Sequence, residues 1–144
     1  MRDTILFLCV ANSARSQMAE AIGRSLAPEG TTVMSAGSAP ATVNPYATEA
    51  LAAIGLSTDD HHSKSVNDIP LERVKTVITL CAEEVCPVFP AAEGGDEVVK
   101  LHWPHEDPAP PQGEPRSEEE IRASFARVRD QIRDRLQTYF ADVD

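Results

Sequence analysis

The sequence predicts an α/β fold in which a largely parallel sheet is covered by helices on both faces. Short apolar runs of strand length alternate along the chain with segments whose apolar residues recur at helical spacing. The 144 residues are 42% hydrophobic and 25% charged, which is ordinary for a globular domain that buries a core without disulfide or metal support. Because no repeat or low-complexity tract interrupts the alternation, we expect residues 1–144 to form one domain.

The first half of the chain is expected to hold two strands and two helices. Its opening apolar run is typical of a buried parallel strand. Apolar residues recur at every fourth position after Ser16 or Gln17, which predicts a helix. Pro45 suits the first turn of a second helix and Gly55 its end. The predicted elements are a strand over 4–10, a helix over 16–26, a strand over 31–36 that Gly37 stops, and a helix over 45–54.

The second half is expected to hold two more strands and a long final helix. Ser117 and Glu120 have the spacing of a helix-capping box. The apolar residues that follow lie on one helical stripe, formed by Ile121, Phe125, Val128, Ile132 and Leu136. The predicted elements are a polar loop over 59–68, a helical turn over 71–75, strands over 76–80 and 97–103, a proline-rich loop over 104–116, and a helix that begins at 117.

The charge of the chain excludes several classes of partner. Thirteen basic and 23 acidic residues give a formal net charge of −10, and such a field repels phosphate backbones and anionic lipid heads. No apolar run approaches the roughly 18 residues of a membrane span. We therefore expect neither nucleic acid nor a membrane among the partners. Any anion that the protein binds must be held by a local binding site, against the field of the whole protein.

The apolar run after Arg2 has two interpretations. Its length is at the lower limit for a secretion signal, and Asp3 offsets the positive charge before it, whereas a buried strand accounts for the run equally well. We adopt the strand, which predicts a cytoplasmic protein whose thiols are kept reduced. The three cysteines are an odd number and do not suit a disulfide framework, so we expect them to be reactive, buried or both.

The strongest functional pattern is Cys9, five residues, Arg15 and then Ser16, between a predicted strand and a predicted helix. Ligands of open α/β sheets bind beyond the carboxyl ends of the strands. There, inward-pointing backbone N–H groups, a helix N-terminus and the Arg15 guanidinium would bind a tetrahedral oxyanion. The same donors stabilise a sulfur anion, so we expect Cys9 to be a nucleophile near neutral pH. Ser16 can donate its hydroxyl to that sulfur. The expected oxyanion-binding residues are Val10, Ala11, Asn12, Ser13, Ala14, Arg15 and Ser16.

Plainer interpretations of the cysteines remain open at this point. Cys-x5-Arg alone occurs often by chance, and Cys9 could be a buried cysteine beside an unrelated arginine. Cys81 also follows a predicted strand and could face the Cys9 loop, but Cys81 and Cys86 could equally be small core residues. The strand before the loop, the helix after it and the adjacent Ser16 favour the catalytic interpretation.

The sequence resembles the low-molecular-weight phosphotyrosine phosphatase fold family, and is more closely similar to the thioredoxin-coupled arsenate reductases built on that fold. The resemblance covers nearly the whole chain, and it implies a four-stranded parallel sheet flanked by helices. The matching segments are Cys9 to Glu20, Ser35-Ala36-Gly37, the stretch that contains Cys81 and Cys86, His102-Trp103 and Asp107-Pro108.

This resemblance implies a relay of three thiols. Cys9 attacks the arsenic of arsenate, and Cys81 then attacks the Cys9 sulfur and expels arsenite. Cys86 attacks Cys81 in turn, which leaves a disulfide that an external dithiol, thioredoxin, can reduce. Here four residues separate Cys81 from Cys86, where members of the family often have six. Because positions five apart share no helix face, their pairing requires the segment to loosen.

The resemblance also implies a general acid on the late proline-rich loop, at Asp107 before Pro108. A carboxyl group near an oxyanion site is held in its protonated form by the like charge, which suits the protonation of a departing oxygen. A turn-initiating Asp-Pro is the plainer interpretation. Glu106 is a substitute acid, and we favour Asp107 because its position matches.

We expect no cofactor and no metal. The histidines lack metal-ligand spacing with the cysteines, so zinc is not expected. In some of the resembled reductases an Asn, a Glu, a Thr and an Asp bind potassium; here three positions match in type, at Asn12, Glu20 and Ser63, whereas Ser65 stands at the fourth. Lys64 adds a cation, and we hypothesise that it takes the place of the ion.

Three functions are compatible with these residues. The first is a reductase of arsenate, with phosphate or sulfate as competing oxyanions, thioredoxin as reductant and a monomeric state. The second is a low-molecular-weight tyrosine phosphatase that uses Cys9, Arg15 and Asp107; the absence of an aromatic residue directly after Asp107-Pro108 counts against it. The third is a non-catalytic oxyanion-binding or phosphocysteine carrier module, against which Arg15 argues because it would hold a dianion in place for chemistry.

Overall fold

The computed structural model describes residues 3–9, 12, 14–37, 43–58, 63–65, 68–80, 98–105, 108 and 116–141. Within these ranges the elements follow one another as β1 (Thr4–Cys9), α1 (Arg15–Leu26), β2 (Thr32–Gly37), α2 (Pro45–Ala52), the 3-10 helix η2 (Leu71–Arg73), β3 (Val74–Thr79), β4 (Val99–His102) and α3 (Glu118–Ala141). The strands form one sheet in the order β2-β1-β3-β4. All three pairings are parallel, which confirms the predicted fold class.

β1 lies inside the sheet, between β2 and β3, and all of its residues are buried. Successive side chains of a strand point to opposite faces. Ile5 and Phe7 accordingly lie in one core cluster, and Leu6 and Leu8 lie in another. A continuous apolar run is what burial on both faces requires, and this explains why the pattern of β1 reads as unbroken rather than alternating.

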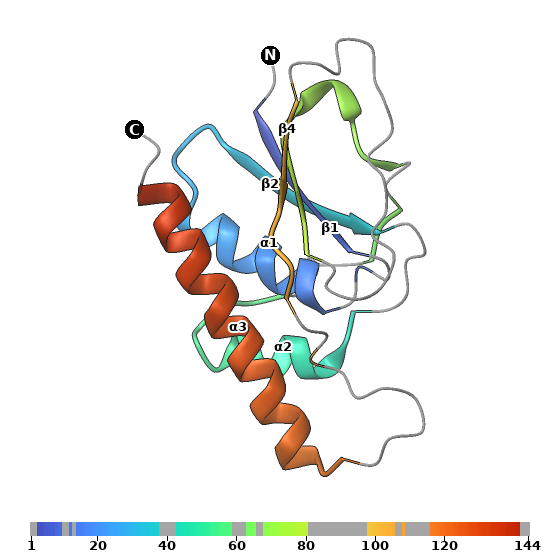
Figure 1. Ribbon diagram of the computed structural model, residues 1–144, viewed down its shortest axis with the longest axis vertical. Helices are drawn as coiled ribbons and strands as arrows, with labels where there is room; N and C mark the ends of the chain where they lie inside the picture. The colour runs from blue at the N-terminus through green and yellow to red at the C-terminus, as the bar shows by residue number, and fades with distance from the viewer. Residues whose placement is uncertain are drawn as a thin grey trace.

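The helices α1, α2 and α3 pack together on the Ile5 and Phe7 face. Figure 1 shows α3, in orange and red, running along α1 and α2. The predicted stripe of α3 is confirmed, since Phe125, Val128, Ile132 and Leu136 are buried. Ser117 caps α3, its Oγ accepting a hydrogen bond from Glu120 N at 3.1 Å. The opposite face carries the second cluster, formed by Leu6, Leu8, Ala36, Ile69, Val74 and Val77.

Some predicted boundaries are wrong by a few residues. β3 begins at Val74, so the expected helical turn over 71–75 is only the three residues of η2. Gly37 ends β2 as a strand residue because it pairs with Cys9 of β1. α2 ends at Ala52, two residues before the predicted end, and Gly55 follows with a positive φ of 81° that favours glycine. None of the helices in the described ranges combines the length and the apolar character of a membrane span.

The parallel arrangement brings four strand ends to one edge of the sheet. Cys9 aligns with Gly37 of β2, and its neighbour Leu8 aligns with Thr79 of β3. Thr79 in turn aligns with His102 of β4. The residues that follow these positions are therefore neighbours in space although they are far apart in the chain, and the chemistry-bearing groups gather there.

Candidate active site

Cys9 ends the central strand and faces the first turn of α1. Its side chain is buried, with 3% of its surface exposed. The Sγ atom lies 2.9 Å from Ser16 Oγ. Ser16 itself is fully buried. A thiol and a hydroxyl are thus held together away from bulk water, at the carboxyl end of β1 where the sequence predicts a nucleophile.

Asn12 holds the Ser16 hydroxyl in place beside the sulfur. Its backbone has a φ of +50°, in the left-handed region that asparagine tolerates better than most residues. From there Nδ2 donates to Ser16 Oγ at 2.8 Å. Because that contact uses only one of the two acceptor sites of the hydroxyl, the hydrogen of Ser16 is available for Cys9 Sγ, and once Cys9 is ionised the sulfur can only accept it. The arrangement stabilises a negative charge on sulfur.

Two other segments hold Asn12 in this orientation. Gln17 Nε2 donates to the Asn12 carbonyl at 3.0 Å and to Oδ1 at 3.1 Å. From the segment 63–65, Ser63 Oγ donates to the same carbonyl and Lys64 N to Oδ1, both at 2.8 Å. With these donors at Oδ1, the Nδ2 group of Asn12 has to face Ser16.

The segment 63–65 is itself fastened to β2. Gly37 N donates to Lys64 O at 2.9 Å, and Gly37 forms an isolated parallel bridge with Ser65. The donors from Ser63 and Lys64 are therefore held at the same sheet edge as Cys9. Ser63 and Lys64 enter the sequence prediction only through the family resemblance. Gln17 is missed, because no local sequence pattern indicates that a side chain will fold back and bind a loop.

Arg15 begins α1 and is held at the sheet edge by carbonyl groups. Its side chain is 5% exposed, and Nη1 donates to His105 O at 2.9 Å and, more weakly, to Leu80 O at 3.4 Å. Leu80 follows β3 and His105 follows β4. A guanidinium is thus positioned beside the Cys9 loop within a protein of net charge −10, where it can capture an oxyanion that the overall field repels.

His105 stabilises the segment 103–105, whose last carbonyl binds Arg15. This segment continues beside β3, since Trp103 N donates to Thr79 O and His105 N donates to Leu80 O. Its Nδ1 lies 2.8 Å from Trp103 O. A carbonyl oxygen can only accept, so Nδ1 carries the proton of the neutral ring. Burial lowers the pKa of His105 below the ordinary value of 6.5, and the positive charges of Arg135 and Arg15 act in the same direction. The neutral ring is therefore favoured in the folded state.

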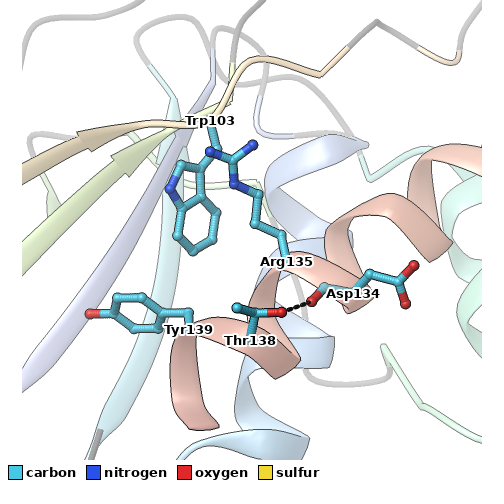
Figure 2. Close-up of a pocket in the computed structure, with 5 residues that line it drawn as sticks. All are labelled: Trp103, Asp134, Arg135, Thr138 and Tyr139. Carbon is cyan, nitrogen blue, oxygen red and sulfur yellow. Dashed lines mark hydrogen bonds between the residues drawn. The ribbon is translucent and has the colours of Figure 1, made fainter. Parts of the chain in front are cut away.

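A shallow open pocket of about 480 Å³ lies behind the segment 103–105, between the end of β4 and α3. Figure 2 shows Arg135 over the Trp103 ring, with its Cζ 5.1 Å from the ring centroid. Tyr139 meets the same ring edge-on at a centroid distance of 5.5 Å. These contacts anchor Trp103 by stacking. The pocket is lined by none of the groups that surround Cys9, and the side chains of Arg135 and Tyr139 at its wall hold Trp103 in place.

The structure places Cys9, Asn12, Arg15 and Ser16 at the end of β1 and the start of α1, with Asn12, Ser16 and Cys9 linked by hydrogen bonds. The remaining predicted site residues lie outside the described ranges, and they are Val10, Ala11, Ser13, Cys81, Cys86 and Asp107, together with the alternative acid Glu106. Ala14 occupies the N-cap of α1 and has no side chain that could cap it. Over the described ranges, no three His, Cys, Asp or Glu side chains cluster in a way that could hold a metal ion.

Residues 4–144 match the model of the family described as low molecular weight phosphotyrosine protein phosphatase. The chain belongs to this family, as the loop from Cys9 to Ser16 and the four-stranded parallel sheet predict.

Within the family, the relatives that the chain matches include arsenate reductases. The arsenate reductase of Halalkalibacterium halodurans is 37% identical over 140 residues, and the match covers 96% of this chain and 95% of that protein. The crystal structure of the Archaeoglobus fulgidus arsenate reductase is 27% identical with a TM-score of 0.76, covering 96% and 99% of the two chains. A thioredoxin-dependent arsenate reductase of Corynebacterium glutamicum is 30% identical with a TM-score of 0.59, covering 96% of this chain and 63% of that one.

Replacing Ser16 by Ala removes the hydroxyl that donates to Cys9. We expect the rate of Cys9 alkylation by iodoacetamide at neutral pH to fall by roughly tenfold, because a sulfur anion loses a hydrogen bond worth on the order of 1.5 kcal/mol. Peptide mass mapping of alkylated Cys9 measures the rate. Ser25→Ala is the matched control, since Ser25 Oγ donates to Ile22 O on the same helix. Equal rates in Ser16→Ala and the native protein would contradict the assignment.

His105→Asn removes a titrating group and keeps an amide near the position of Nδ1. Because the folded pKa of His105 is lowered, its contribution to stability is complete above the unfolded pKa and is lost as the pH falls through the folded pKa. Between about pH 7 and pH 5, the free energy of unfolding is expected to fall more steeply in the native protein than in the variant. Urea denaturation at each pH measures both slopes. An equal slope in the variant would show that His105 titrates alike in both states.

Proposed function

We propose that the protein reduces arsenate to arsenite, with Cys9 as the attacking thiolate, Cys81 and Cys86 as the second and third thiols, and thioredoxin as the source of electrons. That the chain is an enzyme of the arsenate reductase type follows from relatives that share nearly its whole length. The observation that supports the assignment of Cys9 is the Ser16 hydroxyl directed at its sulfur. The roles of Cys81 and Cys86 rest on the sequence and on the balance of electrons.

In the first step, the oxyanion is held next to Cys9 by Arg15 and the surrounding donors. The Cys9 sulfur attacks arsenic, an As–S bond forms, and one As–O bond breaks as the oxygen leaves as water. Ser16 stabilises the thiolate before the attack, and Arg15 neutralises charge on the oxygens. Asp107 is proposed to protonate the leaving oxygen.

In the second step, Cys81 attacks the Cys9 sulfur. The S–S bond forms while the As–S bond breaks, and its electron pair goes to arsenic, which leaves as arsenite in the +3 state. Cys86 then attacks Cys81 and releases Cys9 as a thiolate. The two electrons gained by arsenic therefore equal the two lost by the thiols in forming the Cys81–Cys86 disulfide, which thioredoxin reduces.

We infer the compartment and the oligomeric state of the protein from this chemistry. Thiolate attack requires reduced cysteines, so we propose a cytoplasmic location. We also propose that residues 1–144 act as one domain and as a monomer, because each thiol of the relay comes from the same chain. A thioredoxin-dependent relative is known among the similar structures.

A phosphatase is the second candidate, and the family itself favours it. Phosphate and arsenate are both tetrahedral oxyanions, and Cys9 with Arg15 would serve phosphoryl transfer without further thiols. The two functions differ in redox balance, since only arsenate reduction consumes thiols. The loss of thiols therefore separates them.

Counting free thiols after mixing reduced protein with arsenate, with no recycling partner present, tests the proposed function. We expect about two thiols to be lost per chain with about one arsenite released, as the relay stoichiometry demands. Arsenite is measured by chromatography with elemental detection. Cys9→Ser is the matched control and should lose no thiol. Turnover of an aryl phosphate with no thiol loss would replace the reductase by a phosphatase, and neither result would leave an oxyanion-binding module.

Cys86→Ser should stop the relay after the second thiol. We expect about one arsenite per chain, after which the variant rests as a Cys9–Cys81 disulfide, because no third thiol can free Cys9. Peptide mapping without reduction identifies the disulfide, and thioredoxin with its reductase tests recycling. Sustained turnover in this variant at the native rate would contradict the role of Cys86.

A further inference from the structure

A buried carboxylate lies on α1 one turn beyond Ser16. Glu20 is 1% exposed, and an ionised carboxylate at that depth is costly unless it is paired. Its Oε1 accepts a hydrogen bond from Ser35 Oγ and lies 3.4 Å from Lys64 Nζ. Its Oε2 lies 3.0 Å from Arg24 Nη2. Two cations and one hydroxyl therefore compensate the charge.

The two cations differ in how far they are removed from water. The side chain of Arg24 is 48% exposed, whereas that of Lys64 is 12% exposed. Water screens the first pair much more than the second. The position of Lys64 therefore depends more on Glu20 than the position of Arg24 does. The negative charge of Glu20 in turn offsets the cost of removing the Lys64 ammonium from water.

Lys64 also touches the loop of the nucleophile through its backbone. Its N–H donates to Asn12 Oδ1 at 2.8 Å, Asn12 donates to Ser16, and the Ser16 hydroxyl meets Cys9. One residue thus joins the buried charge of α1 to the chain of hydrogen bonds that ends on sulfur. A displacement of Lys64 would leave Gln17 Nε2 as the remaining described donor to Asn12 Oδ1, so the amide that holds Ser16 beside Cys9 would be less firmly oriented.

A potassium ion, which some of the resembled reductases bind, does not suit the corresponding residues of this chain. Hard monovalent cations need several oxygen ligands with negative charge. The Oε1 atom of Glu20 is already paired with the Lys64 ammonium, and Oε2 with Arg24. Ser65, at the fourth matching position, brings no charge. An added cation would have to displace an ammonium that the backbone holds in place.

We propose that Lys64 is a built-in monovalent cation: its ammonium neutralises Glu20 and so positions its own backbone N–H on Asn12, which makes the reactivity of Cys9 independent of added metal ions. Lys64 is a positioning residue, since it acts on Cys9 only through Asn12 and Ser16. The proposal rests on the proposed function only for the identity of the substrate, because the reactivity of Cys9 can be measured without arsenate.

The test measures Cys9 alkylation by iodoacetamide in the full chain with Cys81→Ser and Cys86→Ser, so that one thiol reports. The rate is compared in potassium chloride, ammonium chloride and choline chloride at equal ionic strength. In this parent protein we expect the same rate in all three salts. In Lys64→Met we expect a rate about tenfold lower in choline, as for a misplaced reactive group. Potassium or ammonium should restore it, because a small cation can replace the lost ammonium.

Two further variants test whether the charge of Glu20 is the cause. Lys64→Met combined with Glu20→Gln removes both members of the pair, and we expect its rate to be insensitive to the choice of salt. Lys64→Arg keeps the charge and should stay within about threefold of the parent protein. Lys75→Met is the matched control, because Lys75 lies near the start of β3, at the far end of the strand from Leu80.

Several results would overturn the proposal. Acceleration of the parent protein by potassium over choline would show that a metal site exists. An unchanged rate in Lys64→Met would show that the ammonium does not act on Cys9, and a slow rate that neither small cations nor Glu20→Gln restores would reduce Lys64 to a packing role. If Lys64→Met does not fold, as judged by circular dichroism, the double variant, Lys64→Arg and the salt series on the parent protein still decide. Normal Cys9 alkylation in the parent protein, together with no arsenate reduction by the native chain that keeps all three cysteines, would instead reject the proposed function alone.

Discussion

The site depends on one hydrogen bond, the one between the Ser16 hydroxyl and the Cys9 sulfur. The hydroxyl is held in place by Asn12, whose Nδ2 donates to it, and it can donate its own hydrogen to the ionised sulfur. Asn12 is in turn constrained by a left-handed backbone and by donors from Gln17, Ser63 and Lys64. A thiol at the end of a buried strand would otherwise behave as a small apolar residue. Here Ser16 and Asn12, which are held by their own hydrogen bonds, give the sulfur a polar environment.

The protein is acidic, and yet its site is built for an anion. The net charge of −10 is a property of the whole surface, whereas the capture of an oxyanion depends on groups within a few ångströms. Arg15 supplies this local charge, and the carbonyl groups of Leu80 and His105 hold it in place. The stacked Trp103, which belongs to the segment 103–105, is therefore part of the support of Arg15 although it is remote from Cys9.

The fold and the centre of the site could be predicted from the sequence because local sequence patterns indicate both. The unbroken apolar run of β1, the stripe of α3 and the spacing of Cys9, Arg15 and Ser16 can be interpreted without knowledge of distant residues. The supporting contacts could not be predicted in the same way. Ser63 and Lys64 reach Asn12 from about fifty positions downstream, and only the fold brings them there. The sequence predicts a later start for β3 than the structure shows. Val74 joins the sheet by pairing with Thr4 of β1, and no local pattern around Val74 indicates that pairing.

The pairing of Gly37 with the segment 63–65 has a consequence for how the chain tolerates changes of length. Register between neighbouring strands is set by the hydrogen bonds of the pair and not by the number of residues that connect them. Changes of chain length between Gly37 and Ser63 therefore leave this register unchanged as long as α2, with its buried Ala47 and Leu51, keeps its place in the core. A tag or a binding peptide grafted into this connection outside α2 would thus leave the pairing beside the nucleophile intact.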